Sequence, residues 1–244
     1  MQHSEADQPE AMEAVRAAIL DAALLHVPFD GWSEATFRAA IRESGVAEGL
    51  ARALFPRGGV DLALEFHRAG DRQMAERLAS ADLAGLRYSE KVAHAIRTRL
   101  EIVEDRELVR RGTTLFALPR HAGEGARAIW GTADAIWRAL GDTSRDFNWY
   151  SKRATLSAVY GATVLYWLGD DSPGRVATWE FLDRRIADVM RIEKVKAGLR
   201  DNPIARAMRS GPIGRACDRA GDAMSGTHRA GKTDPGAGLP GRWR

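Results

Sequence analysis

The chain has 244 residues, 45% of them hydrophobic, so it can build the core of one large or two small domains, and extensive disorder is excluded for most of it. Its formal net charge is +3, and its one cysteine, Cys217, has no CxxC partner, which excludes an internal disulfide and a cysteine-rich zinc site. No apolar run approaches the roughly 20 residues of a membrane span, and the first residues are acidic where a leader peptide is basic. We therefore expect a reduced, cytoplasmic protein.

Charge is divided unevenly along the chain. Residues 190–244 carry 12 Lys and Arg against 5 Asp and Glu, whereas the remainder carries 24 against 28. Lys and Arg supply most of the affinity for phosphates, so a mildly acidic body is the opposite of what DNA binding favours. The basic end fits either an anionic membrane surface or a solvated tail.

Helical periodicity dominates, and strand-like alternation is nearly absent, so the predicted class is all-α. Ser33 is the predicted cap of the second helix. A last short helical piece begins at Pro203, and the Gly-, Pro-, Arg- and Ala-rich sequence from Gly211 is expected to be mostly disordered. In chain order, the predicted helices cover residues 12–25, 33–44, 46–54, 61–80, 89–103, 107–118, 123–140, 147–168 and 173–199.

Residues 33–58 have the layout of a helix, a turn with Gly45, and a second short helix that ends in Phe-Pro. This pattern resembles the helix-turn-helix head of the TetR repressors, in which an all-helical ligand-binding and dimerising body follows. Any buried three-helix corner produces the same pattern. The second helix begins Val46-Ala47-Glu48, without the Arg, Lys, Asn or Gln that reads bases, and Glu48 would face phosphates. We therefore expect no nucleic-acid partner.

The predicted helix over 147–168 has two apolar faces. One follows the spacing of a single buried face and is the predicted lipid-binding set: Leu156, Val159, Tyr160, Thr163 and Trp167. The second face is mostly small and accommodates either a closely packed helix or a long thin ligand: Ala154, Ala158, Gly161, Ala162 and Leu165. Ordinary core packing is the alternative role for each of these residues.

The first turn of the same helix has a different composition. Trp149 and Arg153 are one turn apart and can stack, with Tyr150 and Lys152 beside them. Aromatic residues next to cations at a helix entrance are typical of an interface hot spot. The alternative is a capped helix start with a structural tryptophan.

The last predicted helices combine an apolar and a basic face, as an interfacial amphipathic helix needs. Pro203 interrupts this stretch, so weak and reversible membrane contact is expected. The residues predicted to touch the membrane are Val195, Lys196, Leu199, Arg200 and Ile204.

Patterns typical of catalysis are lacking. Glu90 and His94 are four residues apart, whereas a di-iron bundle uses Glu-x-x-His, and Gly58-Gly59 is not followed by the Lys-Ser/Thr of a phosphate loop. The six histidines are scattered. We therefore predict no catalytic residue, no metal site and no cofactor, with a bound lipid as the only ligand.

Three runs carry a resemblance to a known family: Asp-Phe-Asn-Trp-Tyr-Ser-Lys-Arg at 146–153, Asp-Asp-Ser-Pro at 170–173, and Thr-Trp-Glu-Phe-Leu-Asp-Arg-Arg at 178–185. Over roughly residues 12–210 the chain is similar to the coenzyme Q (ubiquinone) biosynthesis family called Coq nine. The resemblance implies a TetR-like fold without repressor function, a homodimer, and a body that binds isoprenoid quinone precursors or phospholipid. It also implies a partner, the di-iron hydroxylase that acts on demethoxyubiquinone, and a last helix that contacts the bilayer. Its partner-binding surface corresponds here to Trp149, Tyr150 and Arg153.

The predicted organisation is a helix-turn-helix-like head (residues 1–60), a lipid-binding and dimerising body (61–188), an amphipathic basic helix (189–210) and a tail (211–244). The predicted function is that of a non-catalytic accessory protein that presents a quinone intermediate to the hydroxylase. Its predicted location is the bacterial cytoplasm, at the surface of the inner membrane. The alternative is a TetR-type regulator that senses a hydrophobic effector.

Overall fold

The computed structural model describes the backbone of residues 7–143 and 147–201 and the side chains of residues 10–143 and 149–192. All regular structure in these ranges is helical. The chain forms two compact units, residues 1–187 and 188–244, and the described part of the second is the end of a single helix. The helical piece expected from Pro203 and the tail expected from Gly211 lie outside the described residues.

Four helices form the head: α1 (Asp7–Leu24), α2 (Val27–Asp30), α3 (Glu34–Ser44) and α4 (Glu48–Leu54). The predicted cap is confirmed, because the Ser33 hydroxyl accepts a hydrogen bond from the Thr36 amide at 3.2 Å. Gly45 ends α3 with a left-handed φ of 67°, a conformation that costs glycine little. The core that holds these helices together is apolar and fully buried, and includes Ile19, Val27, Phe37, Phe55 and Leu62.

Helix α4 begins two residues later than predicted, because Ala47 is still extended (φ −56°, ψ 132°). Its only first-turn charge is acidic, as the sequence indicated, and its arginine is engaged by carboxylates. Arg52 pairs with Glu48 at 3.0 Å and with Glu34 of α3 at 2.9 Å. The helix that would enter a DNA groove in a repressor thus carries a neutralised cation.

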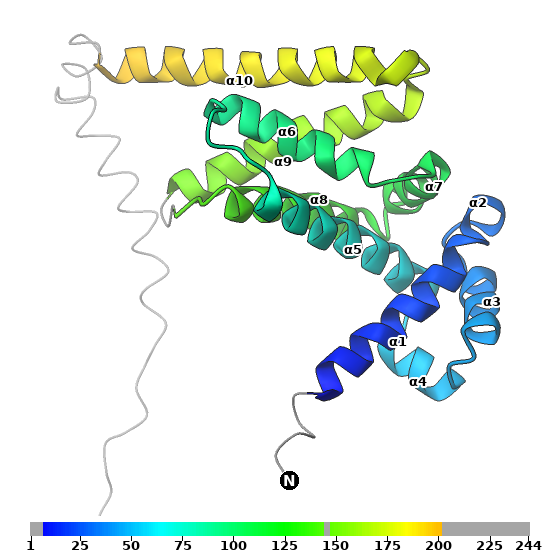
Figure 1. Ribbon diagram of the computed structural model, residues 1–244. Coiled ribbons are helices and arrows are strands. Elements are labelled where there is room, and N and C mark those ends of the chain that lie inside the picture. The colour runs from blue at the N-terminus through cyan, green and yellow to red at the C-terminus, as the bar shows by residue number, and fades with distance from the viewer. Residues whose placement is uncertain (1–6, 144–146, 202–244) are drawn as a thin grey trace, which may run out of the picture. The chain divides into compact units, whose positions relative to one another are not determined.

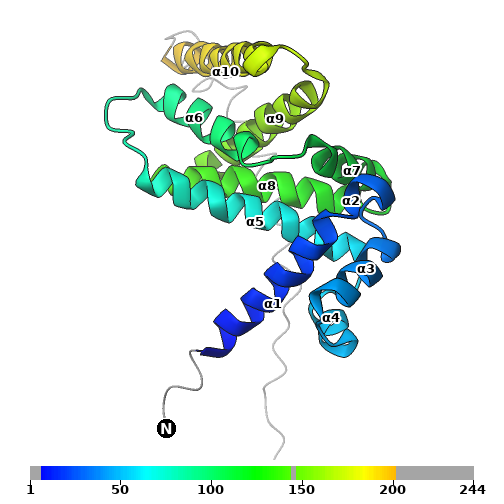
Figure 2. The ribbon, with the colours of Figure 1, turned by 45° about the vertical axis from the view of Figure 1, so that its right-hand side comes forward.

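Five helices form the body: α5 (Gly59–Ser80), α6 (Tyr88–Glu101), α7 (Arg106–Ala117), α8 (Ala122–Ala139) and α9 (Phe147–Gly169). Helices α5 and α8 run side by side, α6 packs on α5, and α9 packs on α8 (Figures 1 and 2). Helix α7 joins the head to the body, since the Trp32 indole donates to the Leu108 carbonyl at 3.0 Å and Arg111 donates to the Pro28 carbonyl at 2.8 Å.

A tight turn separates α9 from the last helix. The sequence predicted one helix from Pro173, but the structure has a 3₁₀ turn (Pro173–Arg175) before α10 (Val176–Asp201). Gly174 and Arg175 both have a φ near 60°, which no α-helix accommodates. Asp170 caps this turn by accepting from the Thr178 hydroxyl and amide and from the Ser172 amide, and these bonds lower the pKa of its carboxyl.

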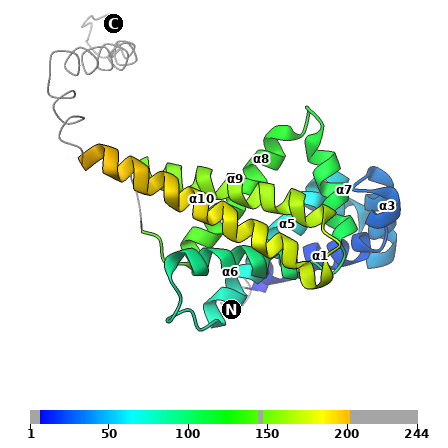
Figure 3. The same ribbon diagram turned by 90° about the horizontal axis from the view of Figure 1, so that it is seen from above.

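The first turns of α10 fold back beside α9 and α6 (Figure 3). Tyr166 of α9 stacks on Phe181 with ring centroids 4.4 Å apart, and Arg97 of α6 lies 4.8 Å over the Trp179 ring. These contacts hold residues 176–187 to the body and cover α9.

Candidate functional site

The body encloses an apolar cavity of about 410 Å³ between α5, α6, α7, α8 and α9. This volume lies within the range of small-molecule sites, about 300–1,000 Å³. Trp32, in the turn before α3, reaches into it from the head. The larger apolar side chains on its wall include Trp32, Phe66, Leu100, Leu108, Phe116, Ile129 and Leu165.

The cavity opens between the α7–α8 corner and α9. Its exposed lining residues are Ala117, Ala122, Ala126 and Leu165, and Leu165 keeps 62% of its surface exposed. Gly125 lets α8 approach α7 at this corner, because a Cβ on it would lie 2.7 Å from the Phe116 Cβ. We call these four exposed residues the rim.

The structure places the five residues predicted to bind lipid on the buried face of α9. Of these, Tyr160 lines the cavity, whereas Leu156, Val159, Thr163 and Trp167 are buried but do not line it. The cavity wall takes its other α9 residues from the neighbouring face: Gly161, Val164 and Leu165. Of the small face that the sequence left open, Gly161 and Leu165 line the cavity, whereas Ala154, Ala158 and Ala162 do not. The role of the other four predicted residues in lipid binding stays a prediction.

One end of the cavity is polar. Arg99 is 3% exposed, donates from Nε to Asp71 at 2.7 Å and from Nη2 to the His67 carbonyl at 3.0 Å, and lies against Gly70. A Cβ on Gly70 would be 2.6 Å from the guanidinium carbon, so the backbone leaves room for this cation. Arg99, His67 and Tyr160 all line the cavity.

His67 and Tyr160 remain uncharged at this polar end. Burial lowers the pKa of His67 to about 4, although the Asp71 carboxylate opposes the shift. Its Nε2 lies 2.7 Å from the Thr132 hydroxyl, which donates to Asp71 at 2.9 Å. Burial raises the pKa of Tyr160, so its phenol keeps its proton.

Sequence reasoning missed His67 and Arg99. Arg99 carried a signal, because it follows Val92 and Ile96 at the spacing of the buried face of its helix. A cation in that position requires a buried carboxylate, and Asp71 is that partner.

Three aromatic side chains meet where α8 and α9 begin to pack. The Trp149 ring lies 5.9 Å from Trp130 and 4.7 Å from Tyr150, at 79° to the latter. Tyr150 is 62% exposed and Trp149 is half-buried. We call Trp130, Trp149 and Tyr150 the aromatic corner; Trp130 was not anticipated from the sequence.

The predicted stack of Trp149 and Arg153 is confirmed, with the guanidinium 4.1 Å from the ring centroid. Arg153, however, is only 1% exposed and pairs with Asp134 at 2.6 Å and with Asp142 at 3.2 Å. It therefore supports the Trp149 ring from beneath rather than offering its own surface, because its charge is enclosed by two carboxylates.

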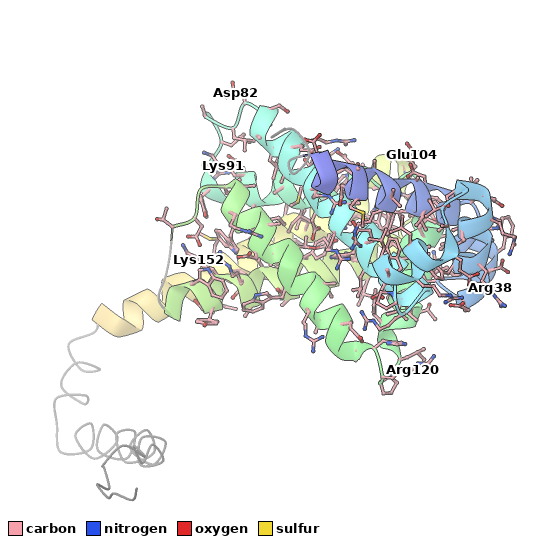
Figure 4. The ribbon with its side chains drawn as sticks, turned by 90° about the horizontal axis from the view of Figure 1, so that it is seen from below. Arg38, Asp82, Lys91, Glu104, Arg120 and Lys152 are labelled. Carbon is pink, nitrogen blue, oxygen red and sulfur yellow. The ribbon has the colours of Figure 1, made fainter. Side chains whose placement is uncertain are left out.

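Lys152 lies beside the aromatic corner, near the end of α8 that is opposite Arg120 (Figure 4). Its ammonium pairs with Asp142 at 2.7 Å and lies 5.3 Å from the Trp137 ring. Together with Arg153 it anchors the segment that follows α8 to the start of α9.

The cavity and the aromatic corner lie along one face of α8. Ala126 of the rim and Trp130 of the corner are one helical turn apart, and Ala122 is one turn further. A molecule that leaves through the rim therefore emerges next to the exposed aromatic surface.

Potential metal sites and membrane contacts concern the described part of the chain. In the described residues, no three His, Cys, Asp or Glu gather at a potential metal site. None of the described helices is long and apolar enough to cross a bilayer. Of the predicted membrane contacts, Val195, Lys196, Leu199 and Arg200 belong to α10 but their side chains are not described, and Ile204 lies outside the described residues.

Comparison with known proteins gives consistent relatives. The COQ9 family model matches residues 122–193. The chain is 34% identical over 187 residues to "Ubiquinone biosynthesis protein COQ9, mitochondrial" of Drosophila melanogaster, covering 75% of this chain and 57% of the relative. It is 30% identical over 194 residues to the Homo sapiens protein of the same name, covering 76% and 61%. The chain thus spans about three fifths of the length of these relatives.

Among solved structures, the TetR transcriptional regulator from Nitrosomonas europaea ATCC 19718 is similar, with a TM-score of 0.57 and 21% identity over 70% of this chain and 95% of that one. At that identity the likeness establishes the fold, which is all-α and TetR-like. The sequence matches go further: this chain is similar to COQ9 proteins over about three quarters of its length, and residues 122–193 match the COQ9 family model.

Proposed function

We propose that this chain is a non-catalytic, lipid-binding accessory protein of ubiquinone biosynthesis. It takes up an isoprenoid quinone intermediate and presents it to the hydroxylase that acts on demethoxyubiquinone. The names of its relatives support the pathway. The hydroxylase, a homodimeric state and a peripheral contact of the basic end with the bacterial inner membrane are parts of the same proposal.

The observation that carries the proposal is the position of the cavity rim beside the aromatic corner on α8. Apolar surface that leaves water gains about 25 cal/mol per Å², so an apolar cavity retains an isoprenoid chain without any reactive group. The aromatic corner supplies the exposed Tyr150 and the supported Trp149, the residue types that dominate protein interfaces. Lipid and partner then meet at one place.

The polar groups of the cavity favour binding over catalysis. A general base works best with a pKa near the operating pH, and His67, at about 4, is far below neutrality. The charge of Arg99 is compensated by Asp71 at 2.7 Å. Both groups are held by neighbours and suit the recognition of a ligand.

The test is an inventory of the lipids that copurify with the full chain, by native mass spectrometry and organic extraction. Wild type is compared with Gly161→Leu, since Gly161 lines the cavity and an ideal Cβ there meets only Ile129, at 3.8 Å. Gly131→Leu is the matched control, because Gly131 lies on α8 outside this cavity and has open space around it.

Isoprenoid or phospholipid in wild type and Gly131→Leu, with most of it lost from Gly161→Leu, is the expected result. Leucine also propagates a helix better than glycine, by up to about 1 kcal/mol, so the variant is expected to stay folded. Equal lipid content in all three proteins would remove the cavity from the proposal.

The same preparation separates this function from transcriptional regulation. Operator binding with a steep salt dependence would support a regulator. We expect no such binding, because Arg52 is paired with Glu34 and Glu48.

A further inference from the structure

The two ends of the cavity differ in chemistry. Trp32, Leu108 and Phe116 line its apolar side, and Arg99, His67 and Tyr160 form the polar end. The polar end is assembled from α5, α6 and α9, with Thr132 of α8 behind it. Four helices thus bring polar side chains to one point of a hollow whose remaining lining is apolar except for Thr113.

Two of these side chains carry hydrogen-bond donors at the wall of the cavity. Within the described residues, Arg99 donates from Nε and Nη2, and its Nη1 lies close to Gly70. Tyr160 lines the cavity with its phenol protonated, and its hydroxyl also hydrogen-bonds to Thr132. Because a buried hydrogen-bond donor is stabilised by an acceptor, the polar end favours a ligand that places oxygen atoms there.

The charges at this end cancel. Arg99 is paired with Asp71, while His67 and Tyr160 are neutral. An anionic head would find the cation already compensated and would face the Asp71 carboxylate close behind it. A neutral group with several oxygen acceptors loses no charge–charge attraction and is not repelled by the carboxylate.

We propose that the lipid enters this cavity head first. A neutral ring that carries carbonyl or ether oxygens occupies the polar end and accepts hydrogen bonds from Tyr160 and Arg99. Its apolar tail lies along the apolar side of the cavity and continues through the rim. The inference rests on the proposed lipid-binding function and adds the orientation of the ligand and the class of its head. A head held in this way is shielded from water and reaches a partner only when the lipid slides back past Ala126 and Leu165.

Titration calorimetry on the lipid-stripped full chain tests the proposal with three probes that have alkyl tails of nine or ten carbons: 2,3-dimethoxy-5-methyl-6-decyl-1,4-benzoquinone, decylbenzene and decanoate. The quinone is expected to bind most tightly. Tyr160→Phe removes one oxygen atom and is expected to weaken quinone binding by about 3–10-fold, the value of one hydrogen bond, while decylbenzene binding changes by less than about twofold. Tyr166→Phe is the control, because Tyr166 stacks on Phe181 outside the cavity and should leave both affinities unchanged.

A second measurement needs no variant. The carbonyl stretching frequency of the bound quinone in the infrared is expected to be lower than in hexane, since hydrogen bonds weaken the C=O bond. An unshifted carbonyl band, an equal loss of both probes in Tyr160→Phe, or tighter binding of decanoate than of the quinone would each overturn the head-first arrangement. If no probe binds wild type, the proposed lipid-binding function itself fails.

Discussion

The start and the middle of α9 use buried polar groups for opposite purposes. At the start of the helix, Arg153 is enclosed by Asp134 and Asp142 and supports the Trp149 ring, so that the chemistry inside serves an exposed surface. In its middle, Tyr160 and Gly161 face a hollow, with the Arg99–Asp71 pair beside it. One helix therefore carries a rigid outer surface and the wall of an inner site.

Two arginine–tryptophan stacks, one buried and one exposed, show how burial changes the role of the same contact. Arg153 lies 4.1 Å over Trp149 and is 1% exposed, whereas Arg97 lies 4.8 Å over Trp179 with its side chain 50% exposed. The contacts look alike, but only the first is withdrawn from water. Burial, more than contact geometry, decides what each stack contributes.

The largest effect is expected from Arg153→Met. It leaves the Asp142 carboxylate, 4% exposed, with one cation fewer and frees the Trp149 ring, so the free energy of unfolding should fall by about 3–5 kcal/mol. Urea denaturation followed by circular dichroism measures it. Arg138→Met is the control, because Arg138 pairs with the same Asp134 from a side chain that is 69% exposed and should cost less than about 1 kcal/mol. Similar losses in both variants would contradict the distinction between buried and exposed pairs.

The next effect concerns the polar end of the cavity. The pKa of His67 is about 4 in the folded protein and about 6.5 in the unfolded chain. The unfolded chain therefore takes up a proton first as the pH falls, so the contribution of His67 to the free energy of unfolding is complete above pH 6.5 and is lost toward pH 4. Three charged side chains near the His67 ring also act on its pKa. The carboxylate of Asp71 raises it, and the cations of Arg99 and Arg68 lower it further. Between pH 7 and 4.5, wild type should lose about 2 kcal/mol more unfolding free energy than His67→Gln. Parallel pH profiles for the two proteins would show that burial does not hold this histidine neutral.

The outer surface is tested by Tyr150→Ala, an exposed residue whose removal leaves Arg153 and its carboxylates in place. If the aromatic corner is the partner surface, affinity for the demethoxyubiquinone hydroxylase of the same organism should fall about 30-fold, or about 2 kcal/mol. Surface plasmon resonance provides the measurement. Phe29→Ala removes an aromatic ring that is 82% exposed in the head and should have no effect. Loss of binding in the Phe29 variant alone would move the partner surface to the head.

The smallest effect is expected from Arg97→Met. The Arg97 side chain also pairs with Glu101 at 2.7 Å, but both groups are about half exposed, so stability should fall by only about 0.5–1 kcal/mol. Thermal unfolding beside the Arg153 variant gives the comparison directly. A loss as large as that of Arg153→Met would show that the contact of α6 with α10 matters more than its exposure indicates.

The existence and order of the helices could be predicted from the sequence, except for the short α2 at Val27–Asp30, because amphipathic periodicity and capping are local properties. The Ser33 cap and the Trp149–Arg153 stack followed from residues three and four apart on one helix. The 3₁₀ turn at Pro173–Arg175 did not, since the left-handed φ of Arg175 depends on the Asp170 cap that surrounds it.

The sequence by itself determined the all-α class, the acidic start of α4 and the concentration of aromatic residues at the start of α9. Only the tertiary structure decided which face of α9 lines the cavity, that Trp130 completes the aromatic corner, and that His67 and Arg99 meet Tyr160. The physical reason is that a hollow is the space neighbouring helices leave unfilled, which depends on how α7 and α8 cross α9. Periodicity along one helix predicts which residues are buried. It does not predict whether another side chain or a ligand fills the space next to them.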